Sequence, residues 1–395
     1  MEINRRQAMA GGLFAAGTLL TGWGGDAMAE TREKARALGL KITGMRTILV
    51  APRSVFVKIE TNQGITGLGV ALQTSKEVAT AAAIMENERV LIGRDPTRIE
   101  AIWQELYHAP RWRGGPLTAA ISAIDIALWD IVGQALGQPI HMLLGGPVRD
   151  SIRIYASAMD MTPAEFEKQR AQGITATRVQ APKGSVSSMI ATTRRWREIV
   201  GPDHELAIHM DGTLATRDAM QYLHGVEDLN LLWVEEPIQM DDVEDWAMLR
   251  SRTTTPLATG ERVLTKWGFA PYLSRHLIDF AQPDLCSCGG FTEARKIAAL
   301  AETNRIQMAP HGPHESAGAF VNFHFDAATP NFFAQEVRDY SSQFELDLHE
   351  GLVPKIANGF AALPDRAGLG TVLNETVAAK RPYAPLTRSS ETRAF

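Results

Sequence analysis

Six side chains that can exchange protons or bind metal ions follow short apolar runs in the second half of the chain. They are Asp211, Glu235, Glu261, Asp284, His311 and Glu336. Carboxylates that converge repel one another strongly unless a cation compensates them. Mg2+ binds carboxylate oxygens, so three of these acids are expected to hold one Mg2+. Glu235 and Glu236 are adjacent, so one of them would bind the ion and the other would pair with a cation or support the site.

The apolar runs are regularly spaced along the chain. Eight runs occur, and the second to the eighth end at residues 180, 211, 235, 261, 284, 311 and 336. A strand, a helix and their loops need roughly 25 to 30 residues, so the spacing predicts an α/β fold with a (β/α)8 barrel. Functional residues of such barrels lie at the C-terminal ends of the strands. A doubly wound open sheet is the alternative, but no Gly-rich phosphate loop follows the first strand.

The N-terminal half has a different pattern. Residues 55–71 alternate apolar and polar side chains around a turn at 62–64, which predicts a β-hairpin. Asp95 and Pro96 are expected to begin a helix. Residues 117–137 are apolar almost all round, which predicts a buried helix ending at Gly137. We therefore expect an α+β domain over 41–150, a barrel domain over 151–345, and a segment over 346–395 that packs back on the first domain.

The composition is that of a globular protein, with 395 residues, 45% hydrophobic and 22% charged, and a net charge of -5. No basic tail is present, so nucleic acid is not an expected partner. Arg5 and Arg6 precede an apolar stretch too short to span a bilayer, and Ala27-Met28-Ala29 resembles a cleavage site. Residues 1–29 are thus predicted to be a twin-arginine signal peptide, which implies a periplasmic protein without stable membrane association. A frayed or membrane-anchoring helix is the alternative.

The motifs on these runs resemble those of the enolase superfamily, in its mandelate racemase subgroup, from about residue 41 to 385. The second half carries, in order, HMDGT, WVEEP, TGERV, QPDLCSCGGFTEARKIAALAE and APHGPHES. The first half carries ETNQGITGLG and AISAIDIALWDIVGQALGQPIHMLLGG. Several motifs in order at the family's spacing make the resemblance specific. It implies that the N-terminal domain caps the barrel.

The resemblance also implies a role for each strand-end residue. Acids that end strands three, four and five of the barrel would hold one Mg2+, namely Asp211, Glu235 and Glu261. His311 would act as a base supported by Asp284. Glu336, after strand eight, would contact the reaction intermediate.

These roles agree with the chemistry of proton abstraction next to a carboxylate. The reaction yields an enediolate, whose additional charge needs electrostatic stabilisation. A divalent ion bound to the substrate carboxylate supplies it. An imidazole oriented by a carboxylate is a suitable base near neutral pH. Glu336 could donate a hydrogen bond to the developing oxyanion.

Within the subgroup, TGERVLTKWGF, QPDLCSCGG and the loop YHAPRWRGGP most resemble acid-sugar dehydratases similar to galactonate dehydratase. The loop contains Arg111 and Arg113, which are candidates for binding the distal part of a sugar acid. Gln180 and His314 are further candidates for substrate binding.

Two positions depart from the family's patterns. Racemases and cycloisomerases of the family usually carry Lys-x-Lys on the second strand, where this chain has Arg178-Val179-Gln180. Arginine is too basic to act readily as a general base, so two-base inversion is not expected, although Arg178 stays a candidate catalytic residue. Sugar-acid dehydratases often place a histidine two residues after the metal aspartate, where this chain has Thr213. The acid that expels the leaving hydroxyl is therefore unassigned. His209, two residues before Asp211, is expected to be structural.

The leading prediction is an exported, Mg2+-dependent dehydratase that converts an acid sugar to a 2-keto-3-deoxy acid. A cycloisomerase or epimerase of a sugar acid or anhydro-sugar acid is the alternative among enzymes. A non-catalytic sugar-acid binder is the third possibility. The expected partner is a small-molecule acid sugar, and a homo-oligomer is expected.

Overall fold

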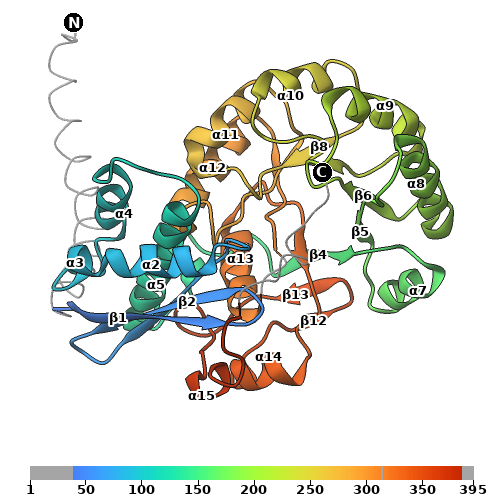
Figure 1. The fold of residues 1–395 in the computed structure, drawn as a ribbon. Coiled ribbons are helices and arrows are strands. Elements are labelled where there is room, and N and C mark those ends of the chain that lie inside the picture. Colours follow the sequence, from blue (N-terminus) through green and yellow to red (C-terminus); the bar gives the residue numbers. More distant parts are fainter. Residues whose placement is uncertain (1–38, 313–314, 385–395) are drawn as a thin grey trace, which may run out of the picture.

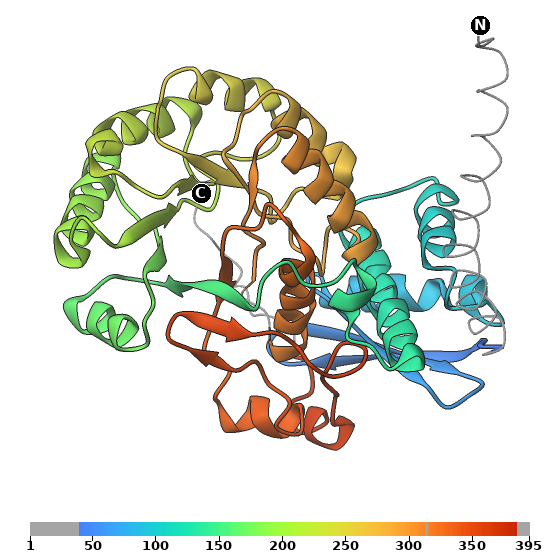
Figure 2. The same ribbon diagram turned by 180° about the vertical axis from the view of Figure 1, so that it is seen from behind.

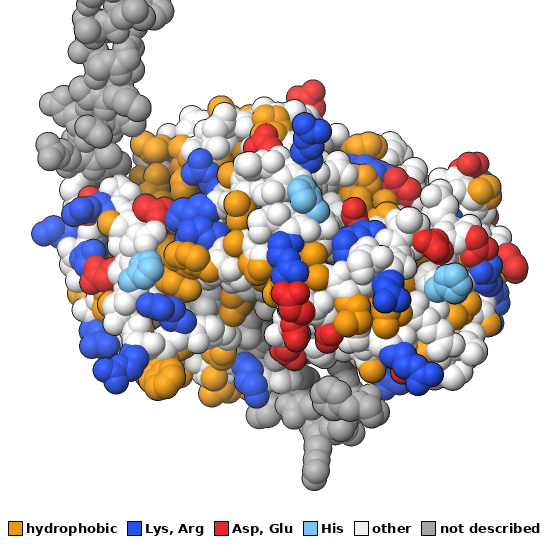
Figure 3. Space-filling model, turned by 90° about the horizontal axis from the view of Figure 1, so that it is seen from above, with side chains coloured by type: hydrophobic (Ala, Val, Ile, Leu, Met, Phe, Trp, Pro, Cys, Tyr) orange, Lys and Arg blue, Asp and Glu red, His pale blue; other side chains and the backbone are white. Residues whose placement is uncertain are grey.

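Residues 39–312 and 315–384 are described by a computed structural model of the chain, shown in Figure 1. The predicted signal peptide over residues 1–29 and the candidate residue His314 lie outside these ranges. Figure 3 shows acidic and basic side chains interspersed over one face of the molecule.

The N-terminal domain contains an antiparallel sheet of three strands in the order β1-β2-β3. The strands are β1 (Ile42–Val50), β2 (Ser54–Thr61) and β3 (Thr66–Ala71). Strands β2 and β3 pair in the register Val57 to Gly69, which confirms the predicted hairpin. Val55, Val57 and Ile59 are fully buried against the helices of the domain, because alternate residues of a strand share one face.

Five helices complete this part of the chain. They are α2 (Glu77–Glu86), α3 (Glu88–Leu91), α4 (Ile99–His108), α5 (Pro116–Leu136) and α6 (Ile140–Leu143). The predicted start of α4 is wrong, because Asp95 accepts hydrogen bonds from the backbone and hydroxyl of Thr97 in a turn, and the helix begins at Ile99. Helix α5 ends as predicted, since Gly137 adopts a left-handed conformation with φ 65°. Its length and apolarity would suit a membrane span, but 72% of that apolar window is buried in the protein.

All eight predicted runs contain strands, and these strands pair in parallel. They are β4 (Ser151–Ala158), β5 (Ala176–Gln180), β6 (Glu205–His209), β7 (Val234–Glu235), β8 (Leu257–Thr259), β9 (Phe280–Ala281), β10 (Gln307–Met308) and β11 (Gln335–Val337). The sheet runs in sequence order from β4 to β10, and β11 pairs with β4. A parallel bridge between Met308 and Phe332 joins the last two runs. The sheet thus returns on itself, as a (β/α)8 barrel requires.

Helices follow the strands and form an arc around them in both ribbon views (Figures 1 and 2). They are α7 (Pro163–Ala171), α8 (Val186–Val200), α9 (Thr216–Val226), the 3-10 turn η1 (Glu227–Leu229), α10 (Val243–Arg250), α11 (Thr265–Ser274), α12 (Gly290–Thr303) and α13 (Ser316–Ala328). The strands enclose an apolar cluster that includes Tyr155, Trp233 and Phe280. The polar residues at the strand ends lie next to this apolar cluster, and Trp233 of the cluster donates a hydrogen bond to Glu235.

The last described segment contains α14 (Gln343–Leu348), β12 (Ile356–Ala357), β13 (Phe360–Ala362) and α15 (Glu375–Ala378). Strand β13 pairs antiparallel with β4 of the barrel. Beyond it the chain reaches the N-terminal sheet, where Glu375 of α15 accepts a hydrogen bond of 2.6 Å from Lys58 of β2. The segment therefore contacts both the barrel and the N-terminal domain.

Candidate metal and catalytic site

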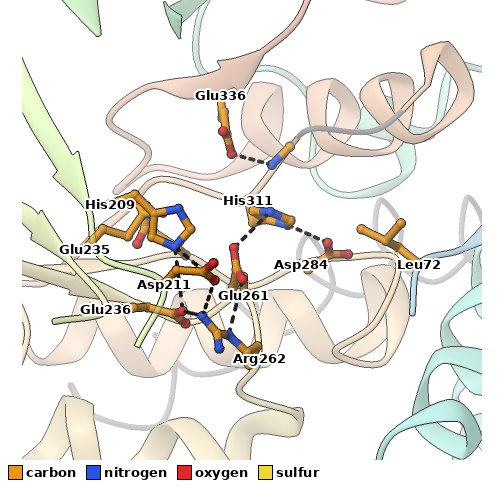
Figure 4. Close-up of polar contacts among 12 residues, drawn as sticks. Leu72, His209, Asp211, Glu235, Glu236, Glu261, Arg262, Asp284, His311 and Glu336 are labelled. Carbon is orange, nitrogen blue, oxygen red and sulfur yellow. Dashed lines mark hydrogen bonds and ion pairs between the residues drawn. The ribbon is translucent and has the colours of Figure 1, made fainter. Parts of the chain in front are cut away.

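Side chains from the C-terminal ends of several barrel strands meet in one cluster (Figure 4). Asp211 follows β6, Glu235 and Glu236 end and follow β7, and Glu261 follows β8. Parallel strands of a barrel end at the same rim, so residues that are far apart in the sequence become neighbours there. The next three strands add Asp284, His311 and Glu336.

The part of this cluster that could bind a metal ion consists of Asp211, Glu236 and Glu261 together with His209. Each offers one ligand atom, and these atoms lie within 4.8 Å of one another. The guanidinium of Arg262 lies against the same three carboxylates. Its Nη2 is 2.9 Å from Asp211 Oδ1 and contacts Glu236, and its Nε is 3.3 Å from Glu261 Oε1. Among the described residues, the site contains six carboxylates and two guanidinium groups, so the donor set and its charge fit a divalent cation.

In this structure Glu236, and not the predicted ligand Glu235, lies with Asp211 and Glu261. Glu235 is in register with His209 and points into the barrel one layer deeper. Its Oε1 is 3.2 Å from Arg178 Nη2, and its Oε2 accepts hydrogen bonds from Trp233 and Gln282. The two oxygens of Glu235 are therefore already held by partners from β5, from the segment after β9 and from the residues just before β7.

Backbone geometry brings Glu236 to the rim instead. Strand β7 ends at Glu235, and Glu236 adopts a positive φ of 43°, which non-glycine residues rarely adopt. Asp211 has a similar φ of 61°. The carbonyl of Glu236 accepts a hydrogen bond of 2.7 Å from the backbone of Gly212, so the segments after β6 and β7 stay together. Strained backbone of this kind is often found where a functional side chain must be aimed.

A histidine and an aspartate form a pair beside the carboxylate cluster. His311 Nδ1 is 2.7 Å from Asp284 Oδ2, and its Nε2 is 3.1 Å from Glu261 Oε2. The backbone N–H of Cys286 donates to the other oxygen of Asp284 at 2.8 Å, which orients the carboxylate. The imidazole thus has one nitrogen on a fixed carboxylate and the other directed to the centre of the site.

Charges within the site alter the pKa values of its buried groups. Burial alone would raise the pKa of Glu261, but His311 and Arg262 lower it well below its ordinary value. Burial alone would lower the pKa of His311, whereas Glu261 and Asp284 raise it well above its ordinary value. Burial alone would lower the pKa of Arg178, whereas Glu235 and Glu336 raise it above its ordinary value. For each of these groups, the partner of opposite charge outweighs the effect of burial on the pKa.

Glu336 and Arg178 face each other across the strand ends. Glu336 Oε1 is 3.8 Å from Arg178 Nη1, and Glu336 Oε2 accepts a hydrogen bond of 3.1 Å from the backbone of Gly312. Arg178 Nη1 also donates to Ser157 on β4. Gln180, at the end of the same strand as Arg178, donates to the carbonyl of His209 at 3.2 Å. Arg178 is thus an electrostatic link between Glu235 and Glu336.

The N-terminal domain contacts the loop that follows Asp284. The backbone of Leu72, just after β3, donates to the carbonyl of Cys286 at 3.2 Å, and Ser287 donates its hydroxyl to the carbonyl of Leu72. Figure 4 shows the apolar side chain of Leu72 beside Asp284. The domain therefore covers the edge of the site where the His311–Asp284 pair lies.

Arg111 and Arg113 are not brought to this cluster. They line a cavity of about 290 Å³ within the N-terminal domain, between α2, α4 and α5. Arg113 donates to the carbonyl of Tyr107 and lies over its ring, 5.0 Å from the centroid. The structure therefore gives no support for their predicted contact with a substrate at the strand ends.

Arg262 was not among the residues predicted for the site, whereas His209 was predicted to have a structural role. Arg262 directly follows the acid of the TGERV motif, and a basic residue beside a predicted metal ligand was a usable signal. His209 was expected to share a face with Asp211, two residues on, and it does lie beneath that residue. The orientation of Glu236 had no signal in the sequence, since it depends on where β7 ends.

Known proteins match the chain over most of its length. Residues 29–145 match the mandelate racemase / muconate lactonizing enzyme N-terminal domain, and residues 162–377 match the enolase C-terminal domain-like family. A D-galactonate dehydratase of Verminephrobacter eiseniae is 33% identical over 370 residues, which cover 87% of this chain and 94% of the relative.

Solved structures agree with this match. An enolase from Pantoea ananatis with bound D-gluconate and Mg has a TM-score of 0.80 at 32% identity, covering 87% of this chain and 95% of that chain. The 3,6-anhydro-D-galactonate cycloisomerase of Zobellia galactanivorans has a TM-score of 0.79 at 28% identity, covering 86% of this chain and 99% of that chain. With both of its domains matched, the chain belongs to the mandelate racemase / muconate lactonizing enzyme family and is an enzyme of the enolase superfamily.

Proposed function

We propose that this enzyme is a lyase, a Mg2+-dependent dehydratase that removes water from an acid sugar. The observation that carries the proposal is the position of His311, whose Nε2 lies 3.1 Å from Glu261 of the carboxylate cluster while Asp284 holds its Nδ1. A base beside a cation site is the arrangement needed to abstract a proton next to a carboxylate. The relatives named for D-galactonate dehydratase and for bound D-gluconate and Mg support the substrate class.

The proposed reaction assigns a separate role to the ion and to the residues around it. Mg2+, when bound, supplies positive charge that stabilises an enediolate. His311 takes the C2 proton of the substrate at Nε2, because its Nδ1–H is donated to Asp284 and the tautomer is thereby set. The electron pair of the broken C–H bond is first held in the enediolate. It then forms the C2–C3 double bond, while the C3 hydroxyl takes a proton from a general acid and leaves as water. The resulting enol rearranges to a 2-keto-3-deoxy acid.

We propose that Asp211 and Glu261 hold the ion with one member of the Glu235–Glu236 pair. The geometry favours Glu236, whereas the family resemblance implies Glu235. Glu235→Gln and Glu236→Gln form a matched pair of variants, since each removes one charge and preserves shape. Calorimetric titration with Mg2+ identifies the ligand as the position whose variant loses binding. Equal and normal binding by both variants would exclude either residue as a ligand.

A screen of acid sugars tests the function directly. The purified enzyme with Mg2+ is incubated with aldonic and aldaric acids, and 2-keto-3-deoxy products are detected by carbonyl derivatisation and proton NMR. His311→Asn serves as the inactive control. Thermal shifts with an acid sugar but no turnover would contradict the dehydratase proposal and would indicate a non-catalytic binder.

A cycloisomerase is the second candidate, because the chain has Thr213 where sugar-acid dehydratases often carry a histidine. The similarity to a 3,6-anhydro-D-galactonate cycloisomerase supports this candidate. The NMR spectrum of the product separates the two functions. A cyclised product of unchanged mass would exclude dehydration.

We further propose that the protein is exported to the periplasm through its N-terminal arginine pair. Fractionation of bacterial cells that express the full chain with a C-terminal tag tests this, with the Arg5→Lys, Arg6→Lys double variant as control. Wild type is expected in the periplasmic fraction and the variant in the cytoplasm. Equal distribution of the two would contradict export by this route. The homo-oligomeric state stays a prediction, to be measured by analytical ultracentrifugation.

A further inference from the structure

A buried imidazole lies beneath the carboxylates of the proposed metal site. His209 is the last residue of β6 and is only 3% exposed. Its Nδ1 contacts Arg178 Nη2 of the neighbouring strand and lies 3.5 Å from Glu235 Oε1. Its Nε2 faces the carboxylate cluster, 4.0 Å from Asp211 Oδ1 and 3.8 Å from Glu236 Oε2 (Figure 4). Among the described residues, no hydrogen-bond partner is within reach of this Nε2 atom.

The contact with Arg178 determines which nitrogen of His209 carries the proton. A guanidinium group only donates hydrogen bonds, so the Nδ1 atom that meets it must present its lone pair. A neutral imidazole has one protonated nitrogen, and that nitrogen is therefore Nε2. The Nε2 atom faces Asp211 and Glu236 at 4.0 and 3.8 Å, which is beyond the length of a hydrogen bond.

We propose that His209 is a positioning residue that donates its Nε2–H to the metal-binding carboxylates, with its tautomer set by Arg178. This inference rests on the proposed metal site. A buried donor between two carboxylates favours a small shift that completes a hydrogen bond to one of them. Hydrogen bonds to the groups around an ion orient its ligands, and here the donor would lie on the barrel side of the cluster.

The tautomer also determines which ions the site favours. Because the Nε2 lone pair is replaced by an N–H, His209 cannot act as a ligand, and the protein offers only oxygen atoms. Oxygen ligands suit Mg2+, whereas an imidazole ligand would favour transition metals such as Zn2+ or Cu2+. A ligating Nε2 would require the proton on Nδ1, facing the N–H groups of Arg178. Two donors facing each other in a buried site repel, so the geometry opposes that arrangement.

Pulsed electron paramagnetic resonance of the Mn2+-loaded wild-type enzyme tests the inference without measuring activity. Mn2+ replaces Mg2+ as the probe, and a directly bound histidine produces a 14N modulation of the echo. We expect bound Mn2+ and no 14N modulation from a ligand. A 14N modulation that disappears in His209→Gln would overturn the positioning role. Absence of any Mn2+ binding would instead overturn the proposed metal site, so the two failures are distinguishable.

Two substitutions at the same position provide the matched comparison. Glutamine in His209→Gln keeps an N–H donor, whereas leucine in His209→Leu has none. We expect Mn2+ affinity within about threefold of wild type for glutamine and a loss of about 10- to 100-fold for leucine, the range seen for outer-shell partners of metal ligands. Free Mn2+ is measured by its room-temperature resonance signal, and circular dichroism confirms folding. Affinity in His209→Leu equal to that of wild type contradicts the proposal.

Discussion

Buried carboxylates occur in two regions of this protein, and their pKa values move in opposite directions. At the strand ends, Glu235 is buried, and burial alone would raise its pKa, but Arg178 lowers it below the ordinary value. In helix α5, burial raises the pKa of Asp125 to about 7 and that of Asp130 to about 6. Burial is similar in the two regions, so the difference comes from the partners. A facing cation favours the charged form, whereas backbone N–H groups compensate burial only in part.

The two regions also have different tasks. Asp125 accepts a hydrogen bond from the backbone of Thr292 at the start of α12, and Asp130 accepts from the backbones of Leu68 and Leu369. Each aspartate thus joins α5 to a segment that is distant in the sequence. The acids of the cluster at the strand ends would bind a cation, which requires a stable negative charge. The acids of α5 hold the N-terminal domain, the barrel and the C-terminal segment together.

The largest effect is expected for His311→Asn. Asparagine can still reach Asp284 but cannot accept the C2 proton, so kcat should fall by about 10²- to 10⁴-fold, the usual contribution of a general base. Proton NMR in D2O should show that exchange at C2 of the substrate stops. His224→Asn, at an exposed position of α9, is the control and should retain full activity. Rapid exchange that persists in His311→Asn would show that another group is the base.

Asp125→Asn should change how stability depends on pH. The pKa of Asp125 is about 7 in the folded protein and about 4 in an unfolded chain, so its contribution is complete below pH 4 and is lost as the pH rises to 7. Between pH 4 and 7, the free energy of unfolding of the variant should therefore rise relative to that of wild type by about 1.4 kcal/mol per pH unit. Urea unfolding at pH 5, 6 and 7 measures this. Asp365→Asn at an exposed position is the control. Parallel pH profiles for Asp125→Asn and wild type would contradict the raised pKa.

Glu261→Gln should abolish stabilisation by Mg2+. An ion that binds only the folded state stabilises it by about 2.7 kcal/mol at a concentration of 100 Kd. Wild type should therefore melt at a higher temperature as Mg2+ is added, and the variant should not. Glu244→Gln, which removes an exposed partner of Arg275, should respond like wild type. Equal shifts for Glu261→Gln and wild type would place the ion elsewhere.

Asp130→Asn should have the smallest effect of the four. Its two oxygens accept hydrogen bonds of 2.7 Å from two backbone N–H groups, and asparagine has only one oxygen to offer. One N–H would be left without its acceptor, at a cost of about 1–3 kcal/mol. Urea unfolding at pH 7 measures the loss. No loss of stability would mean that water reaches this junction and replaces the missing acceptor.

Regular spacing in the sequence was enough to predict the barrel and the residues at its rim. The eight apolar runs all contain strands, because short runs that alternate with helices at a constant interval pack stably in few ways. The hairpin of β2 and β3 and the end of α5 at Gly137 followed from turn and cap residues. His311 and Asp284 lie together because the adjacent parallel strands β9 and β10 end at the same rim of the barrel.

Only the tertiary structure decided how neighbouring residues divide their roles. Glu235 and Glu236 are the same residue type, but β7 ends between them. The positive φ of Glu236 turns its carboxylate to the cluster, whereas Glu235 faces Arg178. Arg111 and Arg113 were predicted from a motif, yet their loop packs within the N-terminal domain. Such outcomes depend on where a strand ends and which distant segment packs against it. Those are properties of long-range contacts, which local patterns in a sequence do not encode.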